Sequence, residues 1–378
     1  MKRIPIIDFV RFGSILIVMS NHFFPRSIVQ SIDSPVIRKI ILNVFLDGAH
    51  GVTYFFVVSG FLITQLLVAG ANDFSGVNLG SFYVKRAARI LPLLVAVVLV
   101  ALFLKQSQTL LDPRIQKYHI WDNEQGFGWL FWGSLFTFNF NWYLMVYYAG
   151  VGFQWRVFWT LAVEEQFYFF YPLIVKTLRN RHKVFIFLIG VVLFSLVFRY
   201  MAQFYFDPDD KWMPLASFSV FDQIAVGGIF YFLDEKFGYW LEARRKTSLS
   251  LMLFGIICCF YVCYSASMQS RNYFIYVPTL VAASCALVIL GGLHIPALFS
   301  KTAQIISWPG KLSYGSYLWY TSVMFLIMPV LVSLGGVLGL IYLISTVFFF
   351  AFLSYRYFEV PVNRRIRAWF DLKPSPSE

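Results

Sequence analysis

Apolar runs of about 20 residues recur along the whole chain and are separated by short polar segments. An α-helix needs about 20 apolar residues to cross the roughly 30 Å of hydrocarbon in a bilayer. The pattern therefore predicts an all-α integral membrane protein, built as a bundle of about ten transmembrane helices. These segments lie near residues 5–25, 40–68, 82–104, 155–175, 184–203, 216–233, 248–267, 273–292, 313–332 and 336–358.

One further apolar segment, residues 127–148, is long enough to cross the membrane but is rich in Trp and Tyr. These two residue types gather at the membrane–water interface. We therefore expect an interfacial or re-entrant element here, within a large external loop between the third and fourth predicted helices. The alternative is an additional span, which would move the basic run at residues 176–183 to the outside.

Composition and charge support the membrane assignment and set its orientation. Hydrophobic residues make up 59% of the 378 residues and charged residues only 13%, whereas soluble proteins have about 25% charged residues. The net charge of +12 comes from Lys and Arg residues between the apolar runs. If the N-terminus lies in the cytoplasm, about twice as many Lys and Arg residues fall in inner segments as in outer ones. Arg199 is counted in an outer segment. We therefore predict both termini inside and no nucleic-acid partner.

The same pattern predicts a single transmembrane domain over residues 1–361 and a short basic cytoplasmic tail over residues 362–378. The four cysteines lie in apolar segments without metal-ligand spacing, and five scattered His residues do not form a site. We therefore expect no metal. Asp222, in the sixth predicted helix, is a buried acid for which helix packing is the alternative to function.

Ionisable residues inside a span are candidates for function, because a charge at the bilayer centre costs at least about 2.5–3.5 kcal/mol. Arg11 and His22 both lie in the first predicted helix. Helix geometry places them on one face, about 16 Å apart along the axis. Asp8, Ser14 and Val18 lie near the same stripe. We expect Arg11 toward the cytoplasm and His22 toward the outside, both facing the bundle. The alternative is structural: Arg11 reaches the cytoplasmic interface and His22 caps the outer end.

The fourth predicted helix carries two adjacent acids, Glu164 and Glu165. Glu164 belongs to a polar stripe at helical spacing, so it is the acid that we expect to face inward, at a depth that overlaps that of His22. A His–Glu pair would serve as a general base, with the carboxylate orienting the ring and stabilising its protonated form. The alternative is a structural ion pair or a capping role. The stripe consists of Thr160, Glu164, Tyr168 and Tyr171.

Two further polar groups lie at helix ends. Arg86 and Arg89 are neighbours on one face at the cytoplasmic mouth of the third predicted helix, where guanidinium groups are suited to binding phosphates. Ordinary positive-inside charge is the alternative. Ser313, Tyr317 and Tyr320 form a stripe in the ninth predicted helix, for which interfacial aromatic residues are the alternative.

Six motifs, taken in order along the chain, resemble those of membrane-bound acyltransferase family 3. The resemblance runs almost end to end, from Ile7 to about Pro361. One position departs from the family pattern, because the ninth-helix motif often ends in His where this chain has Tyr320. The motifs are Asp8-Phe-Val-Arg11 with Asn21-His22, Phe55-Phe-Val-Val-Ser-Gly-Phe-Leu-Ile63, Phe82-Tyr-Val-Lys-Arg86-Ala-Ala-Arg89-Ile-Leu-Pro92, Trp159 to Tyr168, Ser313-Tyr-Gly-Ser-Tyr-Leu-Trp319, and Tyr357-Phe-Glu359-Val-Pro361.

The resemblance implies acyl transfer in a bacterial inner membrane, commonly of acetyl from acetyl-CoA or another acyl-CoA. The implied acceptor is a hydroxyl of a cell-surface glycan or other extracytoplasmic molecule. The resemblance implies that His22 is the catalytic base. It also strengthens the functional interpretation of Glu164, as the partner of His22, over the structural one. It implies donor contacts by Arg86 and Arg89, with Arg11 further along the same route. The expected substrate-binding residues are Trp159, Tyr168, Ser313, Tyr317 and Tyr320.

A proton-coupled transporter or acyl-group carrier is the rival interpretation, because ten spans with His and Glu inside also suit a carrier. The chain has no paired-repeat pattern, and this favours the enzyme. A covalent acyl-enzyme is not expected, because no activated Ser or Cys stands beside His22; Ser313 and Ser59 are the remaining candidates. No further domain follows the tenth predicted helix, so we expect the chain to finish the transfer or to hand the acyl group to a separate partner. The acceptor, the acyl chain and the oligomeric state stay open.

Overall fold

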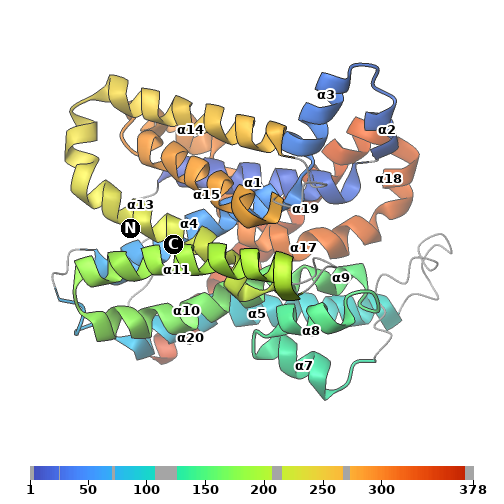
Figure 1. Cartoon of the computed structure of the whole chain (residues 1–378). Helices are drawn as coiled ribbons and strands as arrows, with labels where there is room; N and C mark the ends of the chain where they lie inside the picture. Colours follow the sequence, from blue (N-terminus) through green and yellow to red (C-terminus); the bar gives the residue numbers. More distant parts are fainter. Residues whose placement is uncertain are drawn as a thin grey trace. The chain divides into compact units, whose positions relative to one another are not determined.

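The computed structural model describes residues 4–24, 26–69, 73–106, 126–206, 215–266 and 273–370 (Figure 1). Every regular element in these ranges is a helix, as predicted. Seven helical segments are long and apolar enough to cross a membrane, or eight if one bent pair forms a single span. The seven are Pro5–Phe23, Pro35–Val68, Leu79–Gln106, Arg181–Tyr205, Arg245–Ser265, Tyr273–Gly292 and Gly336–Trp369.

The chain divides into two compact units, each made of segments that are far apart in the sequence. Unit 1 contains the described residues of Asn78–Ala162 and Lys311–Glu378, and unit 2 those of Ile4–Val77 and Val163–Gly310. The division into a domain of residues 1–361 and a tail stays a prediction. The predicted tail is helical as far as Trp369, and residues 371–378 lie outside the described residues.

Unit 2 is a bundle of long helices with short helices at their ends. Helix α4 packs against α1 and α13, and α13 also packs against α11 and α15. Helices α14 and α15 lie side by side (Figure 1). The elements are α1 (Pro5–Phe23), α2 (Arg26–Gln30), α3 (Pro35–Ile40), η1 (Ile41–Phe45), α4 (Gly48–Val68), α11 (Arg181–Met201), η3 (Ala202–Phe206), α13 (Ser217–Glu242), α14 (Arg245–Ser265), α15 (Tyr273–Gly292), η4 (Pro296–Phe299) and α16 (Lys301–Ile306).

Helices α4 and α13 approach closely because each has a glycine at the crossing. A Cβ atom on Gly60 would overlap the carbonyl oxygen of Ile224, and one on Gly227 would overlap the carbonyl oxygen of Val57. Small residues allow helix backbones to approach in this way inside membranes, where van der Waals contact drives association. The position of α4 in unit 2 is therefore fixed by backbone contact.

Unit 1 contains α5, the aromatic segment, and the C-terminal helices. Helix α5 packs against α17 and α20, and α17 packs against α19. Helix α10 (Phe158–Leu178) begins in unit 1 and continues into unit 2. The other elements are α5 (Leu79–Gln106), α7 (Trp129–Phe136), α8 (Phe140–Tyr147), α9 (Phe153–Arg156), η5 (Trp308–Leu312, which straddles the boundary), α17 (Ser313–Leu326), α18 (Met328–Leu334), α19 (Gly336–Ser354), η6 (Tyr355–Glu359) and α20 (Val360–Trp369).

Two predicted segments differ from a single straight span. Residues 127–148 form two eight-residue helices, α7 and α8, each about 12 Å long, which is too short to cross the hydrocarbon. The chain breaks between them near Phe138, whose φ is 56°. The segment is therefore not one straight helix, and its interfacial or re-entrant placement stays a prediction. The ninth predicted span, residues 313–332, is also interrupted, because α17 and α18 meet at an angle of 77° near Ile327.

Candidate active site

Glu164 is held inside unit 2 by two hydroxyl groups. Its oxygen Oε1 accepts hydrogen bonds from Ser59 Oγ at 2.6 Å and from Tyr168 Oη at 2.5 Å. The two hydroxyls also contact each other. Ser59 and Tyr168 are buried, and Glu164 is half-buried. Hydrogen bonds to a charged carboxylate are short and strong. These two bonds hold Oε1 between α4 and the next turn of α10.

This arrangement follows from the way α10 faces α4. Glu164 and Tyr168 are one turn apart on α10, so both reach the same neighbour. A second contact joins the two helices further along, between Thr64 Oγ1 and Tyr171 Oη at 3.0 Å. Glu164, Tyr168 and Tyr171 share one face of α10, as the polar stripe predicts, because all three contact hydroxyl groups of α4. The sequence names Ser59 only as a candidate nucleophile, whereas its hydroxyl donates to Glu164 and so is a partner of the carboxylate.

Helix α1 carries the predicted Arg11 and His22. Ser14 and Val18 of the same stripe are buried, and Arg11 is half-buried. His22 lies in the last turn of α1 and keeps an exposed surface. Its direction toward the bundle stays a prediction. A direct pair between His22 and Glu164 stays a prediction.

The end of α1 that carries His22 packs against the start of α4. A Cβ atom on Gly48 would lie 2.8 Å from Asn21 Nδ2, and one on Gly51 would lie 2.8 Å from the carbonyl oxygen of Ser14. The two helices are therefore antiparallel neighbours. The last turn of α1 and the first turn of α4 lie at the same end of unit 2.

A buried polar cluster that the sequence analysis missed lies at the start of α4. Asp47, His50 and Tyr273 are 6%, 2% and 4% exposed. Tyr273 Oη donates to Asp47 Oδ2 at 3.0 Å and lies 3.3 Å from His50 Nε2. Asp47 Oδ1 accepts a bond from the backbone N–H of Ala49 and so caps α4. The i, i+3 spacing of Asp47 and His50 before an apolar run was the available signal.

In unit 1, the predicted arginine pair lies in the first half of α5. Arg86 is half-buried and Arg89 is exposed. Arg89 lies within electrostatic reach of Glu359, whose carboxylate accepts a hydrogen bond from Ser354 at 2.9 Å. Glu359 also lies against α17, because its Oε1 would be 3.0 Å from a Cβ atom on Gly315. The basic group of Arg89 and the acidic group of Glu359 therefore lie near each other, beside the start of α17.

The predicted α17 stripe is directed partly toward the start of α10. Tyr317 Oη lies 2.8 Å from Thr160 Oγ1 and 3.3 Å from the carbonyl oxygen of Val157. The rings of Tyr317 and Tyr320 are 5.9 Å apart. Ser313 and Tyr320 are buried, while Trp159 and Tyr317 are half-buried. Thr160 thus bonds within unit 1, in contrast to the rest of its stripe.

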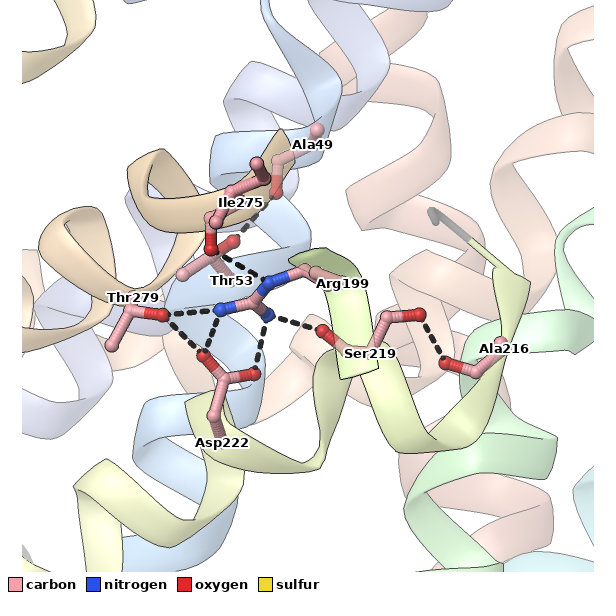
Figure 2. Close-up of polar contacts among 8 residues, drawn as sticks. All are labelled: Ala49, Thr53, Arg199, Ala216, Ser219, Asp222, Ile275 and Thr279. Atoms are coloured by element: carbon pink, nitrogen blue, oxygen red, sulfur yellow. Dashed lines mark hydrogen bonds and ion pairs between the residues drawn. The ribbon is translucent and has the colours of Figure 1, made fainter. Parts of the chain in front are cut away.

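Arg199 is the main charged residue that the charge pattern misplaces. Assigning it to an outer segment is wrong, because it lies in α11 and is 1% exposed, beside Asp222, which is 0% exposed. Figure 2 shows the guanidinium group between three helices. It bonds to both Asp222 oxygens at 2.9 and 3.0 Å, to the Ile275 carbonyl at 2.9 Å, to Thr279 Oγ1 at 2.5 Å and to the Ser219 carbonyl. All five N–H donors of an arginine are used.

Within the part of the chain that the structure describes, no group of three or more His, Cys, Asp or Glu residues could hold a metal ion. The absence of a metal stays a prediction.

Residues 4–356 match the family described as an acyltransferase domain, acyltransferase family 3. The chain belongs to this family. The resemblance to acyltransferase family 3 is therefore confirmed. No solved structure matches this family member significantly.

Three relatives of this acyltransferase family 3 member show similarity along most of its length. The peptidoglycan O-acetyltransferase OatA of Listeria monocytogenes is 25% identical over 366 residues, which are 90% of this chain and 57% of the relative. The O-acetyltransferase OatA of Staphylococcus aureus is 24% identical and covers 84% and 53%. A protein of S. aureus strain COL, provisionally named an O-acetyltransferase, is 27% identical and covers 87% and 55%. The chain therefore spans about half the length of these relatives.

Proposed function

We propose that this chain is an integral-membrane O-acyltransferase that moves an acyl group, acetyl in the first instance, from acyl-CoA to a hydroxyl of an extracytoplasmic glycan. The match to the acyltransferase family over residues 4–356 carries the proposal. The names of the OatA relatives support O-acetyl chemistry and, for the Listeria protein, a peptidoglycan acceptor. Acyl-CoA as the donor rests on the family resemblance and on the arginine pair of α5.

The proposed topology has ten spans with both termini in the cytoplasm of a bacterial cell. The apolar helices support seven of these spans directly. Helices α10 and α13 have 21 and 26 residues, long enough to cross about 30 Å of hydrocarbon, although both carry acids. The acids in the middle of these helices have partners inside unit 2: Glu164 bonds to Ser59, and Asp222 bonds to Arg199. Such pairing is what lowers the cost of polar groups in a membrane.

The donor is proposed to dock through its phosphates on Arg86 and Arg89. Guanidinium groups bind phosphates through paired N–H donors. Arg89 is exposed and therefore accessible to a large anionic ligand. Arg11 is proposed to contact the donor further along its path. The narrow pantetheine arm would then carry the thioester toward the base.

The reaction itself needs a base, and His22 is proposed for that role. Its imidazole takes the proton of the acceptor hydroxyl, and the oxygen attacks the thioester carbonyl. The carbon–sulfur bond breaks, and the departing thiolate takes the proton back from His22. Glu164 is proposed to stabilise the imidazolium, while Ser59 and Tyr168 hold Glu164 in place. Trp159, Ser313, Tyr317 and Tyr320 are proposed to contact the acceptor.

Purified protein with radiolabelled acetyl-CoA and de-esterified envelope glycan from the source cells tests this function. We expect alkali-labile label on the glycan with the native protein. His22→Ala should lower the rate by at least about 100-fold, as expected for removal of a general base. His182→Ala, at the exposed start of α11, is the matched control and should keep the native rate. Transport of a solute without consumption of acetyl-CoA would contradict the proposed function. Full activity of His22→Ala would show that His22 is not the general base.

A further inference from the structure

Helices α9 and α17 bury neutral polar side chains whose bonding capacity is only partly used. Gln154 and Thr321 are both 0% exposed, and Ser322 is 2% exposed. Gln154 Nε2 donates to Ser322 Oγ at 2.9 Å. Gln154 Oε1 and Thr321 Oγ1 have no hydrogen-bond partner among the described residues. Turning the Gln154 amide over would only exchange which of its two ends is free.

The free hydroxyl of Thr321 is unusual for a helix. Ser and Thr hydroxyls in helices commonly bond to the carbonyl four residues earlier. Ser345 and Thr346 in α19 do so at 2.8 Å. A buried polar atom without a partner costs about 1–3 kcal/mol, and folded proteins contain few of them. Of the eleven such atoms in the described residues, Gln154 Oε1 and Thr321 Oγ1 lie on Gln154 and on the neighbour of its hydrogen-bond partner Ser322, and this pairing points to a ligand that supplies the missing bonds.

The location of these atoms along α17 separates them from the arginine end of unit 1. Tyr314 Oη lies 3.3 Å from the carbonyl oxygen of Ile90, next to Arg89. Thr321 lies seven residues further along, about 10 Å at 1.5 Å per residue. It is one turn beyond Tyr317, which bonds to Thr160, so Thr321 shares the face that meets the start of α10. The free atoms therefore lie away from the proposed phosphate contacts.

The chemistry of the group fits a neutral ligand. An amide and two hydroxyls offer both donors and acceptors, which matches the hydroxyl groups of a sugar. The cation of α9, Arg156, is turned elsewhere: its Nε bonds to the Val151 carbonyl at 2.8 Å, and its guanidinium lies 4.3 Å from the Tyr148 ring centre. A phosphate or carboxylate would find no compensating charge on Gln154, Thr321 and Ser322.

We infer that Gln154, Thr321 and Ser322 form a hydroxyl subsite, which binds the hydroxyl groups of a neutral, sugar-like acceptor. This inference rests on the proposed acyl transfer. A site built to bond a hydroxyl discriminates strongly, because its buried polar groups are left unpaired by the wrong ligand. The hydroxyl subsite would therefore select the acceptor and leave the donor unaffected.

The test measures two Michaelis constants with purified protein, one for de-esterified envelope glycan and one for acetyl-CoA. Thr321→Val should raise KM for the glycan about 5–10-fold, as expected for one lost hydrogen bond, and leave KM for acetyl-CoA within about twofold. Gln154→Met should act in the same direction. Thr321→Ser keeps the hydroxyl and should restore native values. Thr346→Val, in α19, is the matched control and should change neither constant.

The outcomes separate this inference from the proposed function. Transfer by the native protein with an unchanged glycan KM in Thr321→Val and Gln154→Met would overturn the hydroxyl subsite alone. A rise in KM for acetyl-CoA instead would assign these groups to the pantetheine arm and also overturn it. Lower thermal stability with unchanged constants would indicate a buried water at this place and overturn it as well. Absence of any transfer by the native protein would overturn the proposed function and this inference together.

Discussion

Arg199 shows how a charge can be accommodated inside the helix bundle. Its five N–H groups reach two carboxylate oxygens, two backbone carbonyls and one hydroxyl, and Thr279 Oγ1 donates in turn to Asp222 Oδ2 at 2.6 Å (Figure 2). Removing one partner of such a pair leaves the other charge buried and uncompensated. The pair therefore joins α11, α13 and α15 at a single point.

We predict that Arg199→Met and Asp222→Leu each lower the free energy of unfolding by about 3–5 kcal/mol. The double variant should recover a large part of this loss, because neither charge is then left unpaired. Unfolding of the purified protein in mixed detergent and dodecyl sulfate measures these changes. Arg245→Met, on the exposed start of α14, is the control and should change stability by less than about 0.5 kcal/mol. Additive losses in the double variant would show that the two residues are not coupled.

Some residues of the site could be predicted from the sequence and others could not. Glu164 was predictable, because helical spacing places it with Tyr168 on one polar face. Its partner Ser59 was not, because Ser59 lies in an apolar motif and the contact joins residues 105 positions apart. Arg199 was misplaced because loop-charge counting treats a basic residue near a helix end as exposed. Local spacing gives the face of a helix but not the helix that it meets.

At the scale of elements, the crossing of α4 and α13 fixes the residues around Ser59. We predict that Gly60→Ala lowers the free energy of unfolding by about 1–3 kcal/mol, because the added methyl overlaps the Ile224 carbonyl and the helices must separate. Unfolding in the same detergent mixtures measures the loss. Gly190→Ala, on α11, is the control, since a Cβ there has no neighbour within 4 Å. Equal stability of the two variants would show that α4 and α13 do not touch in this way.

The sequence marks the break between α17 and α18 more clearly than the break between α7 and α8. The apolar run at residues 313–332 continues through Ile327, so hydropathy predicts one span. Pro329 in the first turn of α18 was the signal for a break, because proline has no N–H to continue the hydrogen bonds of a helix and its ring clashes with the preceding turn. The break at Phe138 has no comparable marker. Its positive φ becomes visible only in the structure.

At the scale of the whole molecule, the ten-span topology requires that polar groups inside apolar helices are paired. Seven segments of the described chain pass on length and hydropathy. Of the other three predicted spans, α10 and α13 carry acids that unit 2 pairs with Ser59 and Arg199, and the third is bent between α17 and α18. The sequence predicted all ten helical segments, and the structure shows a helix in each. The number that cross the membrane belongs to the proposed topology. The proposed reaction needs that topology, because its donor and its acceptor lie on opposite sides.

Transfer across the membrane is the central claim, and oriented vesicles test it most directly. Radiolabelled acetyl-CoA, which does not cross a bilayer, is supplied at the cytoplasmic face, and de-esterified glycan is enclosed at the other. The account predicts alkali-labile label on the enclosed glycan with the native protein and none with His22→Ala. Label only on glycan added to the same side as the donor would contradict the account.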